Sequence, residues 1–302
     1  CTAASVKEVC YICDVTTSVI NTLKKNATIE AFEYEVVYDP QISADTDIND
    51  IVLSDEQQKC FDGLSDLIDA GKPDAALLYG VTGSGKTSVF VKLIQYVLDK
   101  GRNVIMLIPE ISLTPQIVNK FHSLFGNLVS VMHSNLSLTQ RLNEYKRVKK
   151  GNARIVVGTR SAVFAPLENI GLIIMDEEGE QTYKSESSPR YNAKDIAKKR
   201  CVTHNALLLM ASATPSIESF YYAQSGRYKL FTMEKRYSQN RLPAVEIIDL
   251  ATDGFYGDSA IFSEKLIEEI NINLERKEQV ILLLNRRGYY TFISCCDCKE
   301  PV

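Results

Sequence analysis

The chain has 302 residues, 45% of them hydrophobic and 24% charged, which is ordinary for a globular protein and long enough for two or more compact units. Its formal net charge of −4 gives no general attraction for nucleic acid, so any DNA binding must come from a local basic surface. No apolar stretch approaches the roughly 20 residues that span a bilayer, and the N-terminus lacks the pattern of a secretory signal. We therefore expect a cytoplasmic protein without membrane spans.

The N-terminal part, residues 1–38, is predicted to belong to a partial winged-helix domain. Residues 5–23 have the pattern of two helices around a short turn near Asp14, and apolar residues then alternate up to residue 38 as in a β-hairpin. One interpretation is DNA contact through the second helix and Lys24-Lys25. The other is a structural or protein-docking module with a solvated lysine pair, and the sequence leaves both open.

Residues 39–52 are polar and are predicted to be a linker, after which residues 53–235 alternate between helix and strand patterns. The predicted helices are 53–70, 87–101, 114–126, 139–151 and 192–204, and the predicted strands are 75–80, 103–109, 129–133, 153–159, 172–178 and 206–214. Strands this uniformly apolar are buried on both faces, which indicates an α/β fold with a parallel sheet covered by helices. Residues 236–302 are predicted to begin a second such unit, with strands 245–250 and 279–285 around a helix at 262–277.

The eight cysteines are unevenly spaced, so free thiols or metal ligands are expected rather than disulfides. Cys10 and Cys13 lie in an amphipathic segment with no second pair nearby, which favours core packing over metal binding. Cys295 and Cys298 have the two-residue gap of a zinc knuckle and predict half of a zinc site, with further ligands beyond Val302. We therefore expect a fragment of a longer protein.

The stretch GVTGSGKT matches the phosphate-loop pattern G-x-x-x-x-G-K-[ST], directly after one predicted strand and directly before a helix. Its glycines let backbone N–H groups turn inward around phosphates, and the helix N-terminus adds partial positive charge. Lys86 is predicted to reach the β- and γ-phosphates, and Thr87 to offer its hydroxyl to Mg²⁺. The residues predicted to contact nucleotide are Gly80, Val81, Thr82, Gly83, Ser84, Gly85, Lys86 and Thr87.

The stretch LIIMDEEGE, residues 172–180, places four carboxylates within five positions after an apolar run. Carboxylates this close repel one another, so a cation is expected beside them. In a phosphate-loop fold this strand ends next to the phosphates. Asp176 is therefore predicted to hold Mg²⁺, and Glu177 to orient and deprotonate the attacking water. Glu178 and Glu180 are expected to face either solvent or a basic partner.

Several further motifs stand in a specific order along most of the chain. They are GVTGSGKT, IPEISLTPQ, GTRSAVFAP, DEE followed by QTYKSESSPRYNAKDIA, SATPSIES, LNRRGYY and a final CCDC. With this set the chain resembles the bacterial primosomal replication-restart helicases of helicase superfamily 2. The resemblance implies a RecA-like P-loop ATPase lobe, ATP, Mg²⁺ and Zn²⁺ as cofactors, and 3′ to 5′ translocation on DNA at stalled forks. It also implies forked and single-stranded DNA, single-strand-binding protein and primosome proteins as partners.

The resemblance assigns roles to individual residues. Gln57 is implied to read the adenine edge, which favours ATP, and Ser212, Ala213 and Thr214 to link the nucleotide state to DNA contact. Small hydroxyl groups and backbone amides suit phosphate contact, and interleaved aromatic and basic side chains suit stacking on single-stranded DNA. The residues implied to bind DNA are Pro109, Glu110, Thr114, Thr159, Arg160, Ser161, Tyr183, Lys184, Arg190 and Tyr191.

The chain departs from the family pattern at Gly179, where the family has the histidine of DEEH, and at Asn192 and Lys194, where histidine and arginine are expected. Glycine has no side chain to couple hydrolysis to DNA binding, so we expect normal Mg·ATP binding with weakened coupling. Restoring histidine at 179 is then expected to raise DNA-stimulated turnover. The alternatives are another superfamily 2 DNA translocase, or a non-catalytic DNA-binding remnant. The fragment itself is expected to hydrolyse ATP poorly, because the site of this family lies between two lobes.

Overall fold

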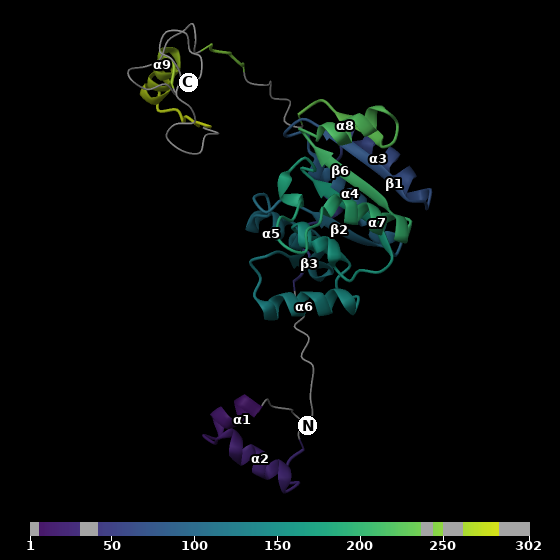
Figure 1. Ribbon diagram of the computed structural model, residues 1–302, viewed down its shortest axis with the longest axis vertical. Helices are drawn as coiled ribbons and strands as arrows, with labels where there is room; N and C mark the ends of the chain where they lie inside the picture. The colour runs from purple at the N-terminus through teal and green to yellow at the C-terminus, as the bar shows by residue number, and fades with distance from the viewer. Residues whose placement is uncertain (1–5, 31–41, 237–243, 250–261, 284–302) are drawn as a thin grey trace. The chain divides into compact units, whose positions relative to one another are not determined.

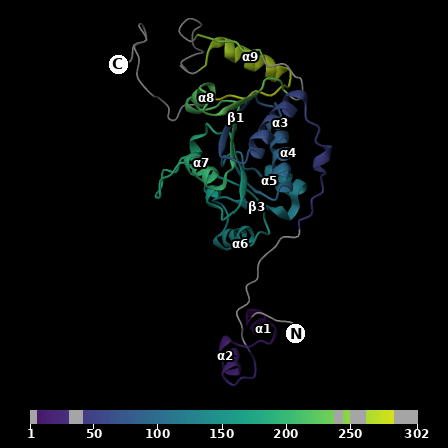
Figure 2. The same cartoon turned by 90° about the vertical axis from the view of Figure 1, so that its right-hand side faces the viewer.

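The computed structural model describes residues 6–30, 42–236, 244–249 and 262–283 (Figure 1). The chain divides into two compact units, Cys1–Asn240 and Arg241–Val302. Figure 2 shows the same elements from the side, where the strands of the first unit lie between two layers of helices. No helix in the described ranges combines the length and the apolar character that crossing a membrane requires.

A seven-stranded parallel sheet forms the centre of the first unit, in the order β3-β4-β2-β5-β6-β1-β7. The strands are β1 (Asp74–Gly80), β2 (Asn103–Leu107), β3 (Val129–Met132), β4 (Ile155–Gly158), β5 (Ile170–Asp176), β6 (Leu207–Ser212) and β7 (Lys229–Met233). All except β7 overlap strands that the sequence predicts, and the parallel α/β fold is confirmed. The prediction misses β7 because this edge strand is mostly exposed, so it lacks the continuous apolar run of a central strand.

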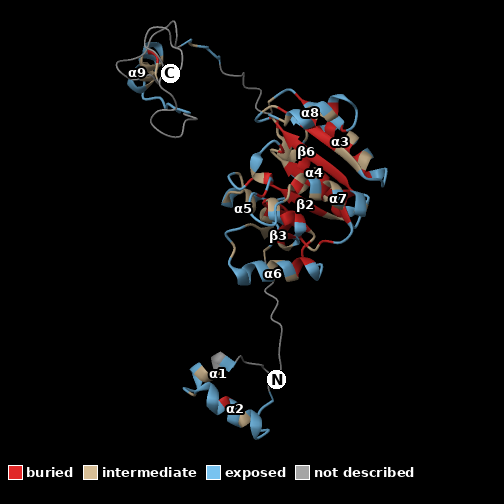
Figure 3. Cartoon of the chain, viewed as in Figure 1, coloured by how far each residue is buried: buried red, intermediate tan, exposed pale blue. Residues whose placement is uncertain are grey.

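Helices cover both faces of this sheet and bury two separate apolar clusters, which appear with the strands as the red centre of Figure 3. The helices are α3 (Asp55–Asp69), α4 (Lys86–Asp99), α5 (Pro115–Phe125), α6 (Leu138–Lys149), α7 (Ala193–His204) and α8 (Ile217–Gln224). Leu78 of β1 packs with the cluster of α3, α4 and α5, whereas Leu77 packs with that of α7 and α8. Alternate residues of one strand thus enter opposite cores, as the pleat requires.

Side-chain caps fix where these helices begin. Ser54 and Gln57 form a reciprocal capping box at the start of α3. Thr114 caps α5, which has Pro115 in its first turn. Ser216 caps α8, a helix that the sequence analysis did not predict. Its eight residues make a stretch too short to show a clear helical period of apolar residues.

The N-terminal segment contains α1 (Val6–Ile12) and α2 (Thr17–Lys25), separated by a turn in which Asp14 has φ +51°. The two predicted helices are therefore present. Most of the predicted β-hairpin falls on residues 31–41, outside the described ranges, so the winged helix stays a prediction. Cys13 is exposed and Cys10 half-buried, so core packing does not explain Cys13.

The second unit contains α9 (Glu264–Glu275), inside the predicted helix at 262–277. Residues 244–249 and 276–283 contain no strand. The two strand predictions are therefore wrong for these described residues. Neither segment has a hydrogen-bonding strand neighbour among the described residues, and Ile247 and Leu283 are 93% and 92% exposed. An apolar run forms a strand only where a neighbour completes its ladder. Cys295 and Cys298 lie outside the described residues.

Candidate nucleotide-binding site

The sheet order brings the two predicted catalytic segments together. β6 lies between β1, which leads into the phosphate loop, and β5, which ends in the acidic turn. The register places Tyr79 beside Ser212, and Asp176 beside Ala211. Because parallel strands end at the same edge, the phosphate loop, the acidic turn and residues 212–214 converge there.

The phosphate loop, residues 80–87, has a backbone that requires glycine at specific positions. Gly83 and Gly85 have φ of +80° and +82°, a region in which only glycine is unstrained. A Cβ at Gly80 would lie 2.8 Å from Ser84 Oγ and 3.3 Å from Met233 Cβ. The loop therefore stays close to the sheet and feeds directly into α4, whose N-terminus favours anions.

Two polar groups in this loop fit a phosphate ligand. The hydroxyl of Ser84 is buried and has no hydrogen-bond partner in the described part of the chain. Lys86 Nζ donates to Gly80 O at 2.8 Å, which places its ammonium group against the loop. An unpaired buried hydroxyl costs free energy unless a further group satisfies it.

Gln57 has a different position from the one implied for adenine recognition. Its side chain is fully buried, with Nε2 donating to Ser84 O at 2.9 Å and Oε1 accepting from Ser54 N at 2.9 Å. Both ends of the amide are thus used inside the protein. This corrects the expectation that Gln57 reads the adenine edge, because in this arrangement it ties the start of α3 to the phosphate loop.

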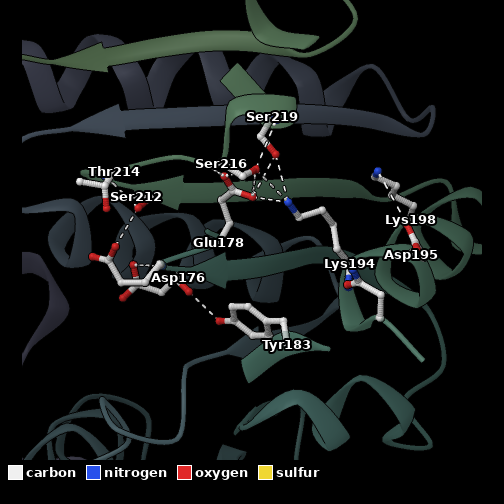
Figure 4. Close-up of polar contacts among 12 residues, drawn as sticks. Asp176, Glu178, Tyr183, Lys194, Asp195, Lys198, Ser212, Thr214, Ser216 and Ser219 are labelled. Carbon is white, nitrogen blue, oxygen red and sulfur yellow. Dashed lines mark hydrogen bonds and ion pairs between the residues drawn. The ribbon is translucent and has the colours of Figure 1, made fainter. Parts of the chain in front are cut away.

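The acidic turn after β5 is held by several hydrogen bonds (Figure 4). Glu177 has φ +45°, an uncommon conformation for a non-glycine residue. Its Oε2 accepts from Ser212 Oγ at 2.8 Å, and Ser212 Oγ accepts from Thr214 N at 3.0 Å. The predicted hydrolytic carboxylate is therefore in direct contact with the segment implied to couple nucleotide and DNA binding.

Asp176 is the carboxylate predicted to hold Mg²⁺. Burial, followed by the negative charge of Glu177, raises the pKa of Asp176 to about 6, although Lys86 acts in the opposite direction. A half-buried carboxylate beside a second one is stabilised by a cation. Thr87 and Asp176 are therefore a suitable protein ligand pair for Mg²⁺, which typically takes one or two carboxylates together with substrate phosphates and water. Within the described ranges, no group of three acidic, histidine or cysteine side chains forms a metal site by itself.

Glu178 does not face solvent. It is 2% exposed, forms an ion pair with Lys194, and accepts hydrogen bonds from Ser216 and Ser219 (Figure 4). Of the two alternatives for this residue, the basic partner is the one found. Glu180 is exposed, as expected for a solvated carboxylate.

Gly179 lies in close contact with the segment after β6. A Cβ at this position would be 2.9 Å from Thr214 O and 3.3 Å from Ser216 N. Both neighbours are backbone atoms, so any side chain here requires the backbone of residues 214–216 to move. This packing argues against the expectation that histidine at 179 raises turnover.

The residues implied to contact DNA come from three segments, and two of these touch. Arg160 Nη1 donates to Thr182 O at 3.2 Å and to Lys184 O at 3.0 Å. Tyr191 meets Phe164 edge to face, with centroids 4.9 Å apart. In this group Lys184, Arg190, Ser161 and Glu110 are exposed, Tyr191 is half-buried, and Pro109 and Thr159 are buried. Thr114 uses its hydroxyl to cap α5.

The prediction that Tyr183 stacks on DNA is wrong. It is only 3% exposed, and its hydroxyl lies 2.6 Å from Asp176 O and 3.0 Å from Leu107 O. Its ring is therefore unavailable for stacking on a base. Burial raises the pKa of Tyr183, which keeps the phenol neutral and able to donate. It holds the turn that follows Asp176 rather than contacting DNA.

Sequence reasoning also missed the contributions of Lys194, Ser216 and Ser219. The apolar pattern gives no information about which basic residue pairs with a buried carboxylate. The signal that was available is local, because Ser216 starts a Ser-x-x-Ser stretch a few residues after a strand, and serine is a preferred helix N-cap.

A family model described as DEAD/DEAH box helicase matches residues 54–221, more than half of the chain. Replication restart protein PriA of Bacillus subtilis (strain 168) is 40% identical over 292 residues, 96% of this chain and 36% of that protein. PriA of Haemophilus influenzae is 41% identical over 222 residues, 74% of this chain and 30% of that protein. A structure of RecG bound to a three-way DNA junction has a TM-score of 0.47 and 22% identity, covering 61% of this chain and 24% of that one. The chain thus spans about a third of the length of the curated relatives it matches.

The raised pKa of Asp176 predicts a pH-dependent stability. Its folded-state value of about 6 lies above the ordinary 3.8, so between these values the unfolded chain binds fewer protons and stability falls as pH rises. Without Mg²⁺, Asp176→Asn should therefore raise the free energy of unfolding at pH 7 by up to about 3 kcal/mol. The difference should vanish below pH 4.

Urea denaturation at pH 3.5, 5 and 7 measures this effect, with the exposed Asp66→Asn as the matched control. A gain of the same size at all three pH values would show that it does not come from ionisation of Asp176.

The packing at Gly179 gives a second prediction. Gly179→Ala should lower the free energy of unfolding by about 1–3 kcal/mol, because its Cβ displaces the backbone near Thr214. Gly179→His should be destabilised similarly, with no gain in DNA-stimulated turnover. Denaturation curves beside Glu180→Ala, an exposed neighbour, test this. An alanine variant as stable as the parent would mean that residues 214–216 yield easily.

Proposed function

Because the chain belongs to the DEAD/DEAH box helicase family, we propose that it supplies the ATP-binding lobe of a DNA helicase of the replication-restart kind. The observation that carries this proposal is the meeting of phosphate loop, acidic turn and residues 212–214 at one edge of a parallel sheet. Identities of about 40% to PriA proteins support it. In this proposal ATP hydrolysis drives 3′ to 5′ movement along DNA at stalled forks.

The nucleotide is bound by the loop of residues 80–87. Backbone N–H groups and the α4 N-terminus would neutralise the phosphates. Lys86, which donates to Gly80 O, lies in the loop as a cation for them, and a phosphate would give the buried Ser84 hydroxyl a partner. Thr87 and Asp176 would hold Mg²⁺, which would supply neutralisation of the phosphate charge. Gln57 keeps the loop in register with α3.

Glu177 is the general base in this proposal. Its uncommon backbone conformation and the hydrogen bond from Ser212 fix the direction of its carboxylate. A base contributes to catalysis only when it is within hydrogen-bond reach of the proton it takes. Fixing the carboxylate against β6 therefore gives a defined place for the attacking water.

The DNA-contacting surface is proposed to include the exposed groups of residues 159–161 and 184–191. Arg160 links these two segments by donating to backbone carbonyls of Thr182 and Lys184, which keeps them side by side. Exposed Lys184 and Arg190 suit backbone phosphates. Zinc binding by Cys295 and Cys298, the winged helix and the protein partners remain predictions.

A non-catalytic DNA-binding remnant is the second candidate, favoured by Gly179 alone. The intact contact between Ser212 and Glu177 argues for catalysis, because a remnant has no need for an oriented base. Another superfamily 2 DNA translocase is the third candidate, and the PriA identities favour restart over it.

Two substitutions separate binding from catalysis in the purified chain. Lys86→Ala should weaken binding of a fluorescent Mg·ATP analogue at least about 10-fold, because it removes a charge next to the phosphates. Glu177→Gln should leave binding within about 3-fold and reduce single-turnover hydrolysis in the presence of single-stranded DNA by about 10²–10⁴-fold. Glu168→Gln, an exposed carboxylate just before β5, is the control. The chain alone is expected to hydrolyse ATP slowly, so a folded parent that binds Mg·ATP but releases phosphate no faster than Glu177→Gln would favour the remnant.

A further inference from the structure

Two adjacent carboxylates hold opposite ends of one short segment, Ser212–Ser216. Glu177 Oε2 accepts from Ser212 Oγ at 2.8 Å, at the end of β6. Glu178 Oε1 accepts from Ser216 N at 2.7 Å, where α8 begins. The backbone of Gly179 lies against the middle of the same segment, at Thr214 O. The acidic turn and this segment are thus joined at three successive positions.

The contacts of Glu178 form a closed buried network (Figure 4). Ser216 Oγ lies 3.1 Å and Ser219 Oγ 2.9 Å from its carboxylate oxygens, and Lys194 Nζ forms the ion pair. Lys194 Nζ also lies 3.1 Å from Ser219 Oγ. The side chain of Glu178 is fully buried and that of Lys194 is 17% exposed. A carboxylate this buried needs its cation, so removal of either partner leaves the other uncompensated.

The position of Lys194 is an independent observation. It is the second residue of α7, and its backbone N–H is capped by Asn192. A cation in the first turn of a helix is opposed by the helix dipole. The ion pair with the buried Glu178 explains why a lysine stands at this position of α7. The pair thereby fixes α7, α8 and the acidic turn relative to one another.

We propose that Glu178 and Lys194 are positioning residues for ATP hydrolysis, whose buried ion pair anchors the Ser216 end of the 212–216 segment and so keeps Ser212 hydrogen-bonded to Glu177. This inference rests on the proposed function, in which Glu177 activates water. In this chain the anchor takes the place of a side chain at position 179, where close packing of the backbone leaves no room for one.

A kinetic comparison in the purified chain tests the proposal. Glu178→Gln and Lys194→Met should each lower the single-turnover rate of ATP hydrolysis at least 10-fold, with Mg·ATP affinity changed less than 3-fold. Lys194→Arg keeps the charge and should retain at least half of the rate. Ser212→Ala combined with Glu178→Gln should be no slower than Ser212→Ala alone, because both act on Glu177 through one hydrogen bond. Lys199→Met, exposed on the same helix, is the control.

A second readout needs no hydrolysis. The amide of Ser216 donates to Glu178, so its hydrogen exchange in the nucleotide-free chain should accelerate at least 10-fold in Glu178→Gln and in Lys194→Met, but not in Lys194→Arg. Faster exchange with an unchanged hydrolysis rate would overturn the positioning role and leave the pair purely structural. If the variants fold and the exchange of the Ser216 amide is unchanged, the ion pair does not anchor this end of the segment. A parent that hydrolyses ATP no faster than Glu177→Gln, with its Ser216 amide protected, would contradict the proposed function and not the anchor.

Discussion

The arrangement depends on partly or fully buried carboxylates at the carboxyl end of β5. Asp176, Glu177 and Glu178 leave the sheet in succession, and each carboxylate is compensated differently. Asp176 lies near Lys86 and has a raised pKa, Glu177 accepts from Ser212, and Glu178 pairs with Lys194. Like charges this close are costly in a partly buried site. The elements around the turn therefore supply hydrogen-bond donors and positive charge to it, from Ser212, Ser216 and Lys194.

The strand order of the sheet allows all three carboxylates to find these partners at the same time. β6 separates β5 from β1, so its end reaches the acidic turn on one side and the phosphate loop on the other. Gly80 keeps that loop against the sheet, and Gly179 lets the segment after β6 approach the turn. One glycine therefore shapes the phosphate loop, and another allows close contact between the acidic turn and the segment after β6. A polar network with every member paired is rigid, whereas losing one partner costs more than an average contact.

Much of the first unit follows from the sequence, because central parallel strands are apolar on both faces and the phosphate loop has a specific pattern in a specific context. The placement of Lys86, Thr87, Asp176 and Glu177 follows from that context. Sequence reasoning failed where a side chain's partner is distant in the chain. Tyr183 and Gln57 are residue types that often bind ligands, but both are buried here and use their polar atoms in internal hydrogen bonds. Neither the Glu178–Lys194 pair nor the edge strand β7 has a periodic signature.

The central claim is that phosphate loop and acidic turn form one metal–nucleotide site. A crystal structure of the chain with Mn²⁺ and a non-hydrolysable ATP analogue tests it most directly, because anomalous scattering locates the metal. The account predicts one Mn²⁺ between the nucleotide phosphates and the Thr87 hydroxyl, with Asp176 as a direct or water-mediated ligand. Nucleotide phosphates away from residues 80–87, or a metal that contacts neither Thr87 nor Asp176, would contradict it.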